Sequence, residues 1–402
     1  MNEPLAVAYL AVMSRFHSYI NSAQKIIQAY KGNEPLALFL KKFFSVNQKY
    51  GSRDRKQVAH LCYCYFRQGS IMNKLPIEER ILSGLFLCSD QSNEILLQLK
   101  PGWNSKISVS INEKLSLLPE IGSIGDIFPF TDELSQGINK TAFILSHLKQ
   151  PDVFLRLRPG KEDLVKKKLK DAGIDIEIIS RTCLAVANTT KIDEAIELDK
   201  EAVIQDLSSQ RTGNFLQSSL SNDPLRISAW DCCAASGGKS IMLYDLYPHI
   251  ELTVSDIRES ILLNLKKRFR EAGITNYKSF LADLTSPPLT IRHSPFDLIL
   301  ADVPCSGSGT WSRTPEQLYY FEKGKVNEYA LLQKRIVANI IPHLKPGGYL
   351  FYITCSVFQK ENEEVVQFMQ QNSGLQLIKM EVLEGYDKKA DTMFAALLRN
   401  PL

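Results

Sequence analysis

Two cysteines and an aspartate stand where covalent chemistry could take place. Asp302 and Cys305 lie in residues 301–307 (ADVPCSG), and Cys355 lies in residues 353–356 (ITCS), each group at the end of an expected strand. A cysteine is more often a small buried hydrophobic residue than a nucleophile. Both thiols here follow a strand among small polar residues, where a nearby helix start would lower the thiol pKa. We therefore expect covalent catalysis by a thiolate, with Asp302 stabilising developing charge.

A second group of residues has the features of a nucleoside-binding site. Residues 231–239 (DCCAASGGK) follow an expected strand, and two glycines with small neighbours let a ligand approach the backbone at a helix N-terminus. Asp256 ends the next strand, where an acid accepts hydrogen bonds from ribose hydroxyls, and Asp283 follows the third, where a carboxylate can receive an adenine amine. A single such aspartate could equally cap a helix. With Asp231 after the first strand, three acids follow successive strands, and this favours an adenosyl ligand.

These groups require a sheet whose strands end at a common edge. From about residue 206, short apolar strands alternate with helices, which predicts an α/β fold with a doubly wound parallel sheet. Ligands of such sheets lie at the carboxyl ends of the strands, where the strand order reverses. The expected strands are residues 227–231, 251–256, 278–282, 297–302, 349–354 and 392–398.

Two regions precede this sheet. Residues 1–150 show apolar residues at helical spacing and then a turn-rich stretch, which predicts a helical N-terminal domain with a connecting segment. Residues 151–205 predict a small α/β domain whose helix carries four lysines within residues 166–170. Such a cluster either contacts phosphate or is only a solvated face. The predicted domains are therefore 1–150, 151–205 and 206–402.

The C-terminal part of the chain resembles the RNA 5-methylcytosine methyltransferases, and among them the bacterial Sun/Fmu-like branch that modifies small-subunit ribosomal RNA. The likeness runs from residue 205 to the C-terminus. The pair PCSG and TCS is its most specific part. The motifs that carry it, in the family order, are DCCAASGGK, SDIRES, ADL, ADVPCSGSGTWSRTPE and LKPGGYLFYITCSVFQKENEEVV.

The resemblance implies a class I methyltransferase with a Rossmann-like sheet that uses S-adenosyl-L-methionine to methylate C5 of a cytosine in RNA, ribosomal RNA first. C5 is too weak a nucleophile to attack a methylsulfonium, and addition of a thiolate to C6 makes it enamine-like. The family assigns that addition to Cys355 and breakdown of the adduct to Cys305. Asp302 hydrogen-bonds the N3/N4 edge of the base, and Lys239 reaches towards it. The implied cofactor-binding residues are Ala234, Ala235, Ser236, Gly237, Gly238, Lys239, Asp256, Asp283 and Asp302.

Two residues depart from the family pattern. Ser236 stands where proline is usual, and Ser312 stands where an arginine is common before Arg313. Neither change removes a reactive group, so they bear on cofactor affinity and phosphate contact. Residues 51–66 and 151–205 also look like the RNA-binding helical domain and the small RNA-positioning domain of that branch.

Other classes of protein share parts of this pattern. A DNA cytosine-5 methyltransferase takes its nucleophile from a Pro-Cys motif followed by a long target-recognition segment, and this chain lacks that layout. An exocyclic-amine methyltransferase carries Asn/Asp-Pro-Pro-aromatic after the fourth strand, where Val303, Pro304 and Cys305 stand here. A transfer-RNA cytosine-5 methyltransferase and a catalytically silent RNA-binding ribosome assembly factor stay open as alternatives.

The bulk composition limits the function classes further. The 402 residues are 44% hydrophobic and 23% charged, which is typical of a soluble protein with two or three domains. Apolar stretches fall short of the roughly 20 residues that cross a bilayer, and the N-terminus lacks a basic signal-peptide start. The eight cysteines lack zinc-site spacing. A net charge of +4 permits a nucleic-acid partner without demanding one. With the resemblance added, we expect a cytoplasmic, monomeric, metal-free protein whose partner is RNA.

Overall fold

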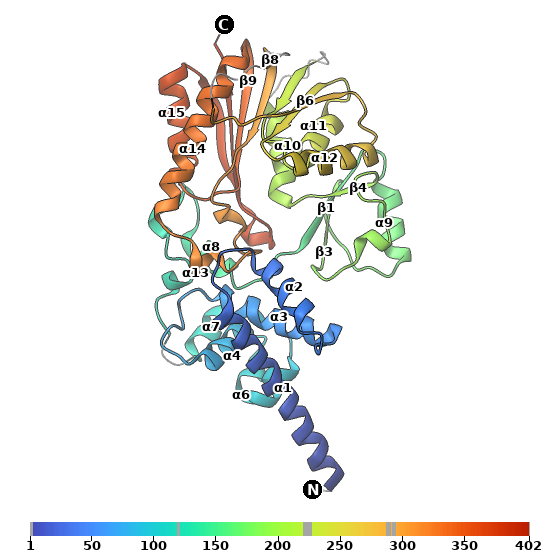
Figure 1. The fold of residues 1–402 in the computed structure, drawn as a ribbon, viewed down its shortest axis with the longest axis vertical. Coiled ribbons are helices and arrows are strands. Elements are labelled where there is room, and N and C mark those ends of the chain that lie inside the picture. Colours follow the sequence, from blue (N-terminus) through green and yellow to red (C-terminus); the bar gives the residue numbers. More distant parts are fainter. Residues whose placement is uncertain (1–2, 119–120, 220–226, 287–290, 292–294, 402) are drawn as a thin grey trace. The chain divides into compact units, whose positions relative to one another are not determined.

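The computed structural model describes residues 3–118, 121–219, 227–286, 291 and 295–401 (Figure 1). The chain divides into two compact units. The helical unit comprises Met1–Asp132, Asn139–Gln150 and Trp311–Glu322, and the α/β unit comprises Glu133–Ile138, Pro151–Thr310 and Lys323–Leu402. The expected helical N-terminal region is confirmed, and residues 311–322 join it from far along the chain.

The helical unit is built from amphipathic helices. Helix α3 buries Val58, Leu61 and Tyr65, which recur at three- and four-residue spacing and so lie on one face. Its neighbours bury similar stripes against it. The described elements of the unit are α1 (Glu3–Ala29), α2 (Leu36–Val46), α3 (Ser52–Arg67), α4 (Ile77–Cys88), α5 (Glu94–Leu99), α6 (Pro101–Asn104), α7 (Ile111–Ser116), η1 (Ile124–Ile127), α8 (Lys140–Ser146) and α13 (Gln317–Tyr320), and η2 (Thr131–Glu133) ends at the boundary with the α/β unit.

Polar contacts hold residues 311–322 within the helical unit. The buried Arg67 guanidinium donates a hydrogen bond of 2.6 Å to the backbone carbonyl of Ser312. The Glu316 carboxylate accepts one of 3.0 Å from the backbone N–H of Leu36, the first residue of α2. A helix leaves its first N–H groups without partners, so this acid caps α2. The chain that leaves the Cys305 loop therefore continues into the helical unit.

The first sheet of the α/β unit is small and antiparallel. Its order is β2-β3-β1-β4, and helix α9 (Glu162–Asp171) packs on it. The strands are β1 (Val153–Leu157), β2 (Glu177–Ser180), β3 (Cys183–Val186) and β4 (Ala202–Ile204). The sequence predicts strands at residues 153–157, 174–179 and 183–187 and the lysine-bearing helix, but not β4, which has only three residues. It also predicts a helix near residue 193, where the structure has only the single 3-10 turn η3 (Ile192–Glu194).

The second sheet has seven described strands in the order β10-β11-β9-β8-β5-β6-β7. Strands β5 to β9 are parallel, as predicted, whereas β11 pairs antiparallel with both β9 and β10, so the sheet is mixed. Strand β10 escaped prediction because polar residues interrupt its apolar ones. The strands are β5 (Ser228–Asp231), β6 (Glu251–Asp256), β7 (Tyr277–Leu281), β8 (Phe296–Asp302), β9 (Leu344–Thr354), β10 (Gln376–Leu383) and β11 (Met393–Arg399).

Helices cover both faces of this sheet, as a doubly wound fold requires (Figure 1). Adjacent residues of β5 face opposite sides, since Ala229 packs with α10, α11 and α12 and Trp230 packs with α14 and α15. The helices are α10 (Leu207–Ser219), α11 (Gly238–Leu246), α12 (Glu259–Glu271), α14 (Gly324–Ile340) and α15 (Glu363–Ser373), with the turns η4 (Ser308–Thr310), η5 (Ile341–His343) and η6 (Tyr386–Lys388) between elements.

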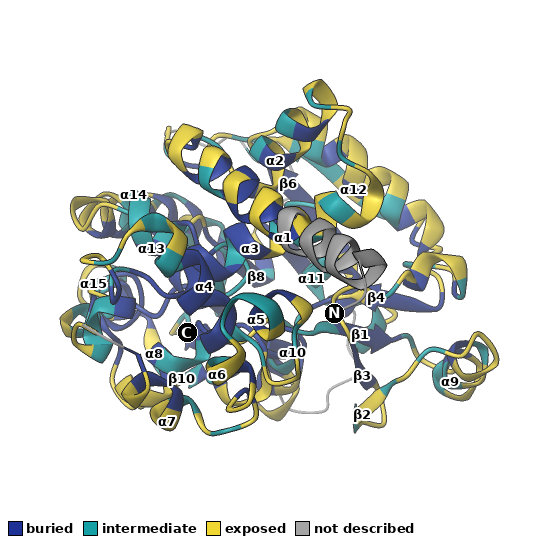
Figure 2. Cartoon of the chain, turned by 90° about the horizontal axis from the view of Figure 1, so that it is seen from below, coloured by how far each residue is buried: buried dark blue, intermediate teal, exposed yellow. Residues whose placement is uncertain are grey.

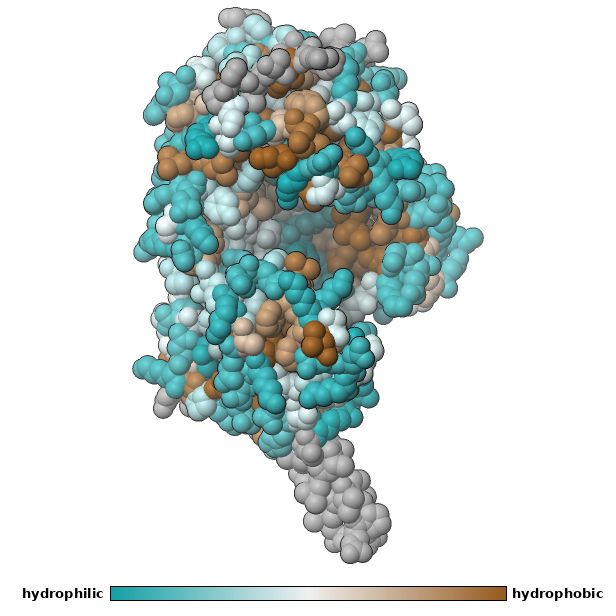
Figure 3. Space-filling view, in the orientation of Figure 1, coloured by the Kyte–Doolittle hydropathy of each residue, from teal (hydrophilic) through white to brown (hydrophobic). Residues whose placement is uncertain are grey.

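Hydrophilic side chains cover most of the face of the α/β unit seen in Figure 3. Helix α9 contributes to this surface, because Lys167 and Lys170 are exposed while Val165 and Leu169 are buried (Figure 2). Of its four lysines, Lys166 and Lys168 are only partly exposed, and Lys168 forms an ion pair with Glu201. Separately, none of the helices described here combines the length and the apolar character that a membrane span needs.

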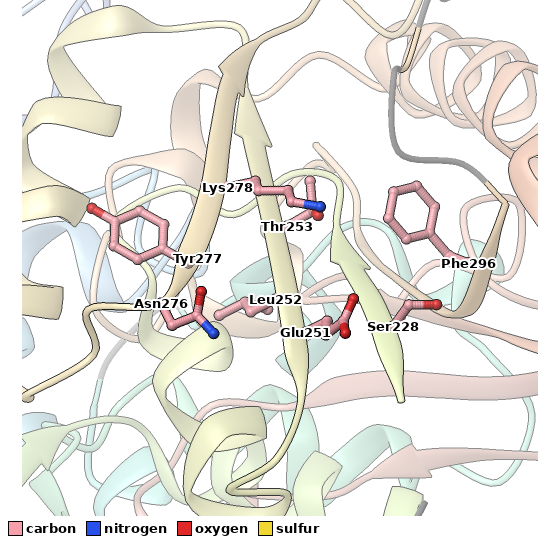
Figure 4. A pocket seen from close by; sticks show the side chains of 8 residues that line it. All are labelled: Ser228, Glu251, Leu252, Thr253, Asn276, Tyr277, Lys278 and Phe296. Atoms are coloured by element: carbon pink, nitrogen blue, oxygen red, sulfur yellow. The ribbon is translucent and has the colours of Figure 1, made fainter. Parts of the chain in front are cut away.

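The strand order reverses between β5 and β8, so the crevice for ligands is expected at the carboxyl ends of these strands. The opposite edge of the sheet has a hollow of its own, with a volume of about 250 Å³. Figure 4 shows it at the start of the strands, with Glu251 and Lys278 among the side chains around it. No cysteine lines that hollow. The thiols lie at the other edge.

A buried ion pair joins the small sheet to the large one within the α/β unit. The Oδ2 of Asp245 on α11 lies 2.5 Å from Nη1 of Arg156, and its Oδ1 lies 2.6 Å from Nη2 of Arg158. Arg156 lies in β1 and Arg158 directly follows it. The Asp245 side chain is only 5% exposed. One carboxylate thus forms ion pairs with two guanidinium groups, whose side chains are 9% and 12% exposed.

Replacing Asp245 with asparagine should lower the free energy of unfolding by roughly 3 kcal/mol, since it leaves two buried cations without their counter-charge. Urea denaturation measures the change. The control is Glu194→Gln, which breaks an exposed pair with Lys191 and should shift stability by less than about 0.5 kcal/mol. Equal effects of the two substitutions would contradict this assignment.

Candidate active site

The parallel pairing of β8 and β9 brings the two cysteine loops together. Asp302, the last residue of β8, pairs with Ile353 of β9, and each chain turns into a loop directly afterwards. The Sγ atoms of Cys305 and Cys355 lie 3.3 Å apart, and both thiols are free. The structure therefore brings together the two cysteines that the sequence singled out.

A glycine sets the distance between these loops. Gly309 donates a hydrogen bond of 2.9 Å to the carbonyl of Cys355, and its own carbonyl accepts one of 2.9 Å from the N–H of Thr392. A Cβ at Gly309 would lie 1.9 Å from the Thr392 carbonyl oxygen. Only glycine allows this approach. The loop after β8 is thereby fastened to the start of the loop after β9.

The environment of Cys305 favours its protonated form. The hydrogen bond with Cys355 and burial raise the pKa of the Cys305 thiol well above its usual range. The charges of Cys355 and of Glu361 act in the same direction. At neutral pH, Cys305 is consequently a thiol that can give a proton to a nearby sulfur.

A lysine and an aspartate lie beside the thiols. Nζ of Lys239 is 2.6 Å from Oδ2 of Asp302, and both side chains are largely buried. Burial alone would lower the pKa of Lys239, but the Asp302 carboxylate raises it above its ordinary value. The pair is therefore a charged one. The sequence predicted both residues for the site, and they meet in the structure.

Two cavities meet at this point. The larger, of about 540 Å³, has Asp256, Asp283 and Asp302 in its wall together with Cys305 and Cys355. The smaller, of about 300 Å³, borders the start of α11. Four residues line both cavities, namely Cys233, Ala235, Asp302 and Cys355.

The residues expected to hold a cofactor are distributed between these cavities. The larger one has Ala235, Asp256, Asp283 and Asp302 in its wall, and the smaller one has Ala234, Ala235, Ser236, Gly238, Lys239 and Asp302. Gly237 lines neither. It has a positive φ of 85°, and a Cβ there would lie 2.8 Å from the ring of Phe269, so it serves the turn into α11.

Asp256 holds the loop before α11. Its Oδ2 accepts a hydrogen bond of 3.0 Å from the N–H of Ala235, which has a positive φ of 46°. Its Oδ1 accepts from the N–H and the Nε of Arg258, at 2.9 and 3.1 Å. Arg258 also lines the larger cavity, and the sequence pattern gave no reason to select it.

Arg268 is a second residue that sequence reasoning missed. From α12 it donates to the carbonyl oxygen and to the Oγ of Ser236, at 3.0 Å each, and it forms an ion pair with Asp199 at 2.6 Å. Ser236 is the residue that departs from the family proline. Its hydroxyl is thus an acceptor for Arg268, a partner that proline could not provide.

Asp231 is a buried acid at the end of β5 and lines the smaller cavity. Its Oδ2 accepts a hydrogen bond of 2.5 Å from Ser240, while its Oδ1 has no partner among the residues that the structure describes. Burial raises the pKa of Asp231 to about 7, although the Ser240 bond opposes the shift. In the described part of the chain, no three or more His, Cys, Asp or Glu side chains are grouped to hold a metal ion.

Comparisons with known proteins point to one family. Residues 222–398 match the family model described as 16S rRNA methyltransferase RsmB/F. The chain is similar to Ribosomal RNA small subunit methyltransferase B of Enterobacter sp. (strain 638), with 31% identity over 175 residues. That match covers 43% of this chain and 40% of the relative, so the chain spans less than half the length of this curated relative.

Two solved structures show that the fold is a known one. The crystal structure of PH0851 superposes with a TM-score of 0.69 at 18% identity and covers 94% of this chain and 98% of its own. NSun6 from Pyrococcus horikoshii, solved with SFG, gives a TM-score of 0.56 at 16% identity, with 68% and 97% covered. At these identities the likeness concerns the fold alone.

The raised pKa of Asp231 makes stability depend on pH. Between about pH 4 and about pH 7 the unfolded chain carries an ionised Asp231, whereas the folded state keeps it protonated, so stability falls as pH rises through this window. Asp231→Asn removes that loss. The free energy of unfolding of this variant, relative to that of the wild type, should therefore increase by a few kcal/mol, as an order of magnitude, between pH 4 and pH 7.5. Urea denaturation at each pH measures it.

Asp297→Asn is the matched control, because its effect on stability should change with pH in the opposite direction. Burial alone would raise the pKa of Asp297, but hydrogen bonds from Ser228 and Lys345 lower it below its usual range. The ionised Asp297 therefore stabilises the fold at pH values above the pKa that this group has in the unfolded chain. The free energy of unfolding lost in Asp297→Asn should grow as pH rises. A difference between wild type and Asp231→Asn that does not change with pH would refute the assignment.

Proposed function

We propose, from the match of residues 222–398 to the family model described as 16S rRNA methyltransferase RsmB/F, that the protein is an S-adenosylmethionine-dependent RNA (cytosine-5-)-methyltransferase acting on ribosomal RNA. The observation that carries the proposal is the 3.3 Å approach of the Cys305 and Cys355 sulfurs beside Asp302 and Lys239. Cytosine C5 methylation uses two groups in this way, one to add to C6 and one to assist release. The proposal also includes that the protein is cytoplasmic and monomeric.

The cofactor fits the larger cavity. Its volume of about 540 Å³ lies within the range of small-molecule sites. Asp256 at the end of β6 would bind the ribose hydroxyls, Asp283 after β7 would receive the adenine amine, and the N-terminal N–H groups of α11 adjoin the same loop. The fold relative solved with SFG, an S-adenosylmethionine analogue, supports this choice. When bound, the cofactor supplies an electrophilic methyl group.

The chain's own residues account for the remaining chemistry. Because Cys305 holds its proton, the attack is assigned to Cys355, whose sulfur forms a bond to C6 of the base. Asp302, paired with Lys239, hydrogen-bonds the N3/N4 edge and steadies the charge that develops there. C5 is then electron-rich enough to accept a methyl group.

Release needs two proton movements. The C5 proton must leave as the C5–C6 double bond re-forms, and the Cys355–C6 bond must break. The Cys305 proton lies close to the departing sulfur and can pass to it. The Cys305 thiolate so formed accepts the C5 proton, and Cys355 afterwards loses its proton to solvent, which restores the starting state.

Cys355→Ala should abolish methyl transfer, because the base is no longer activated. Transfer of radiolabelled methyl groups to ribosomal and transfer RNA measures it, with Cys88→Ser in the helical unit as the control that keeps activity. Wild-type-like transfer by Cys355→Ala would overturn the assignment. Incorporation into transfer RNA alone would move the substrate to that class, and cofactor binding without any transfer would indicate a silent RNA-binding factor.

Cys305→Ala should trap the covalent intermediate. Without the second thiol, the Cys355–C6 bond forms but breaks slowly, so protein and RNA should migrate together on a denaturing gel. The double variant Cys305→Ala, Cys355→Ala is the control and should give no such band. Free protein and preserved turnover in the single variant would leave Cys305 with a packing role only.

A further inference from the structure

A fully buried carboxylate lies beneath the two thiol loops. Glu361, just before α15, is 0% exposed. Its Oε2 accepts hydrogen bonds from the backbone N–H of Ser306 at 2.9 Å and from Nε2 of Gln333 at 2.8 Å. Its Oε1 accepts one from Oγ of Ser356 at 2.7 Å. Three donors from three separate segments therefore converge on one acid.

Each of these donors adjoins a reactive thiol. Ser306 follows Cys305 in the chain, and Ser356 follows Cys355. Gln333 of α14 also donates to the carbonyl of Pro304, at 3.0 Å, on the other side of Cys305. The acid thus holds the loop after β8 and the loop after β9 at the residues next to the sulfurs, and a shift of its carboxylate would move both.

Burying the carboxylate of Glu361 has a free-energy cost that its hydrogen bonds must offset. Taking an ionised carboxylate out of water is unfavourable, and burial raises the pKa of Glu361 while its hydrogen bonds oppose that shift. Charge-assisted bonds to three donors compensate for the burial. The titratable groups that face it are Cys305, Tyr352 of β9 and Tyr329 of α14. Burial raises the pKa of both tyrosines, the hydrogen bond with Cys355 and burial raise that of Cys305, and the charge of Glu361 adds to each shift in the same direction. Glu361 lines neither cavity.

We propose that Glu361 is a positioning residue that fixes the separation of the two sulfurs and, through its carboxylate, sets the electrostatic environment of Cys305. The inference rests on the proposed function for the use made of the thiols. Its geometric part concerns the free protein, so it can be tested without RNA.

Glu361→Gln tests both parts. The amide has no charge and turns an NH₂ group towards donors, so the loops lose a shared acceptor. The midpoint of the pH profile for iodoacetamide alkylation of Cys305, followed by peptide mass spectrometry on RNA-free protein, should move to lower pH. Turnover should fall on the order of 100-fold, as for a misplaced reacting group, and the covalent protein–RNA complex should accumulate.

Two further variants separate charge, geometry and folding. Glu361→Asp keeps the charge but shortens the reach, so it should lower turnover while leaving the Cys305 profile near that of the wild type. It also serves if Glu361→Gln fails to fold. Glu363→Gln is the control, because this buried acid bonds Ser135 and Gln136 instead, at 2.9 and 3.1 Å. It should change neither readout.

An unchanged Cys305 profile and unchanged turnover in Glu361→Gln would refute the proposal, as would equal effects from Glu363→Gln. Failure of the proposed function looks different. In that case the wild type methylates no RNA, while the alkylation profiles of the RNA-free variants still report on Glu361.

Discussion

The parallel pairing of β8 with β9 is the constraint on which the site depends. Neighbouring strands lie about 4.8 Å apart, and parallel strands end at the same edge of the sheet. With Asp302 opposite Ile353, the first residues beyond each strand come within reach of each other. The thiols of Cys305 and Cys355 need only short loops to approach to 3.3 Å. No long segment has to fold over the site to assemble it.

Electrostatics then gives the two thiols different properties. Cys305 is partly buried beside the sulfur of Cys355 and near the buried Glu361, and these surroundings raise the pKa of its thiol. Lys239 supplies the positive charge that balances Asp302 at the junction of the two cavities. In a poorly solvated site such charges interact more strongly than in water. In the proposed mechanism Cys305 therefore serves proton transfer, and the attack falls to Cys355.

Much of this arrangement could be predicted from the sequence, because it follows from strand order. Alternating apolar strands and helices predicted six strands of a parallel sheet, of which five are parallel, whereas the sixth, β11, is antiparallel. The residues after these strands predicted the meeting of Asp302, Cys305 and Cys355. Contacts between distant segments could not be predicted. Arg268 reaches Ser236 from another helix, and nothing in its spacing indicates a partner. Residues 311–322 follow a strand-end loop, yet they pack with the N-terminal helices because a buried guanidinium binds their backbone.

The central claim is that the sulfur of Cys355 becomes bonded to the target base while the sulfur of Cys305 does not. A ribosomal RNA transcript carrying 5-fluorocytidine tests it directly, since fluorine at C5 cannot leave as a proton does and the adduct persists. After incubation with S-adenosylmethionine and nuclease digestion, peptide mass spectrometry locates the modified residue. We expect the nucleotide on the peptide that contains Cys355. A nucleotide on Cys305, or none on either cysteine under conditions of active methyl transfer, would contradict the claim.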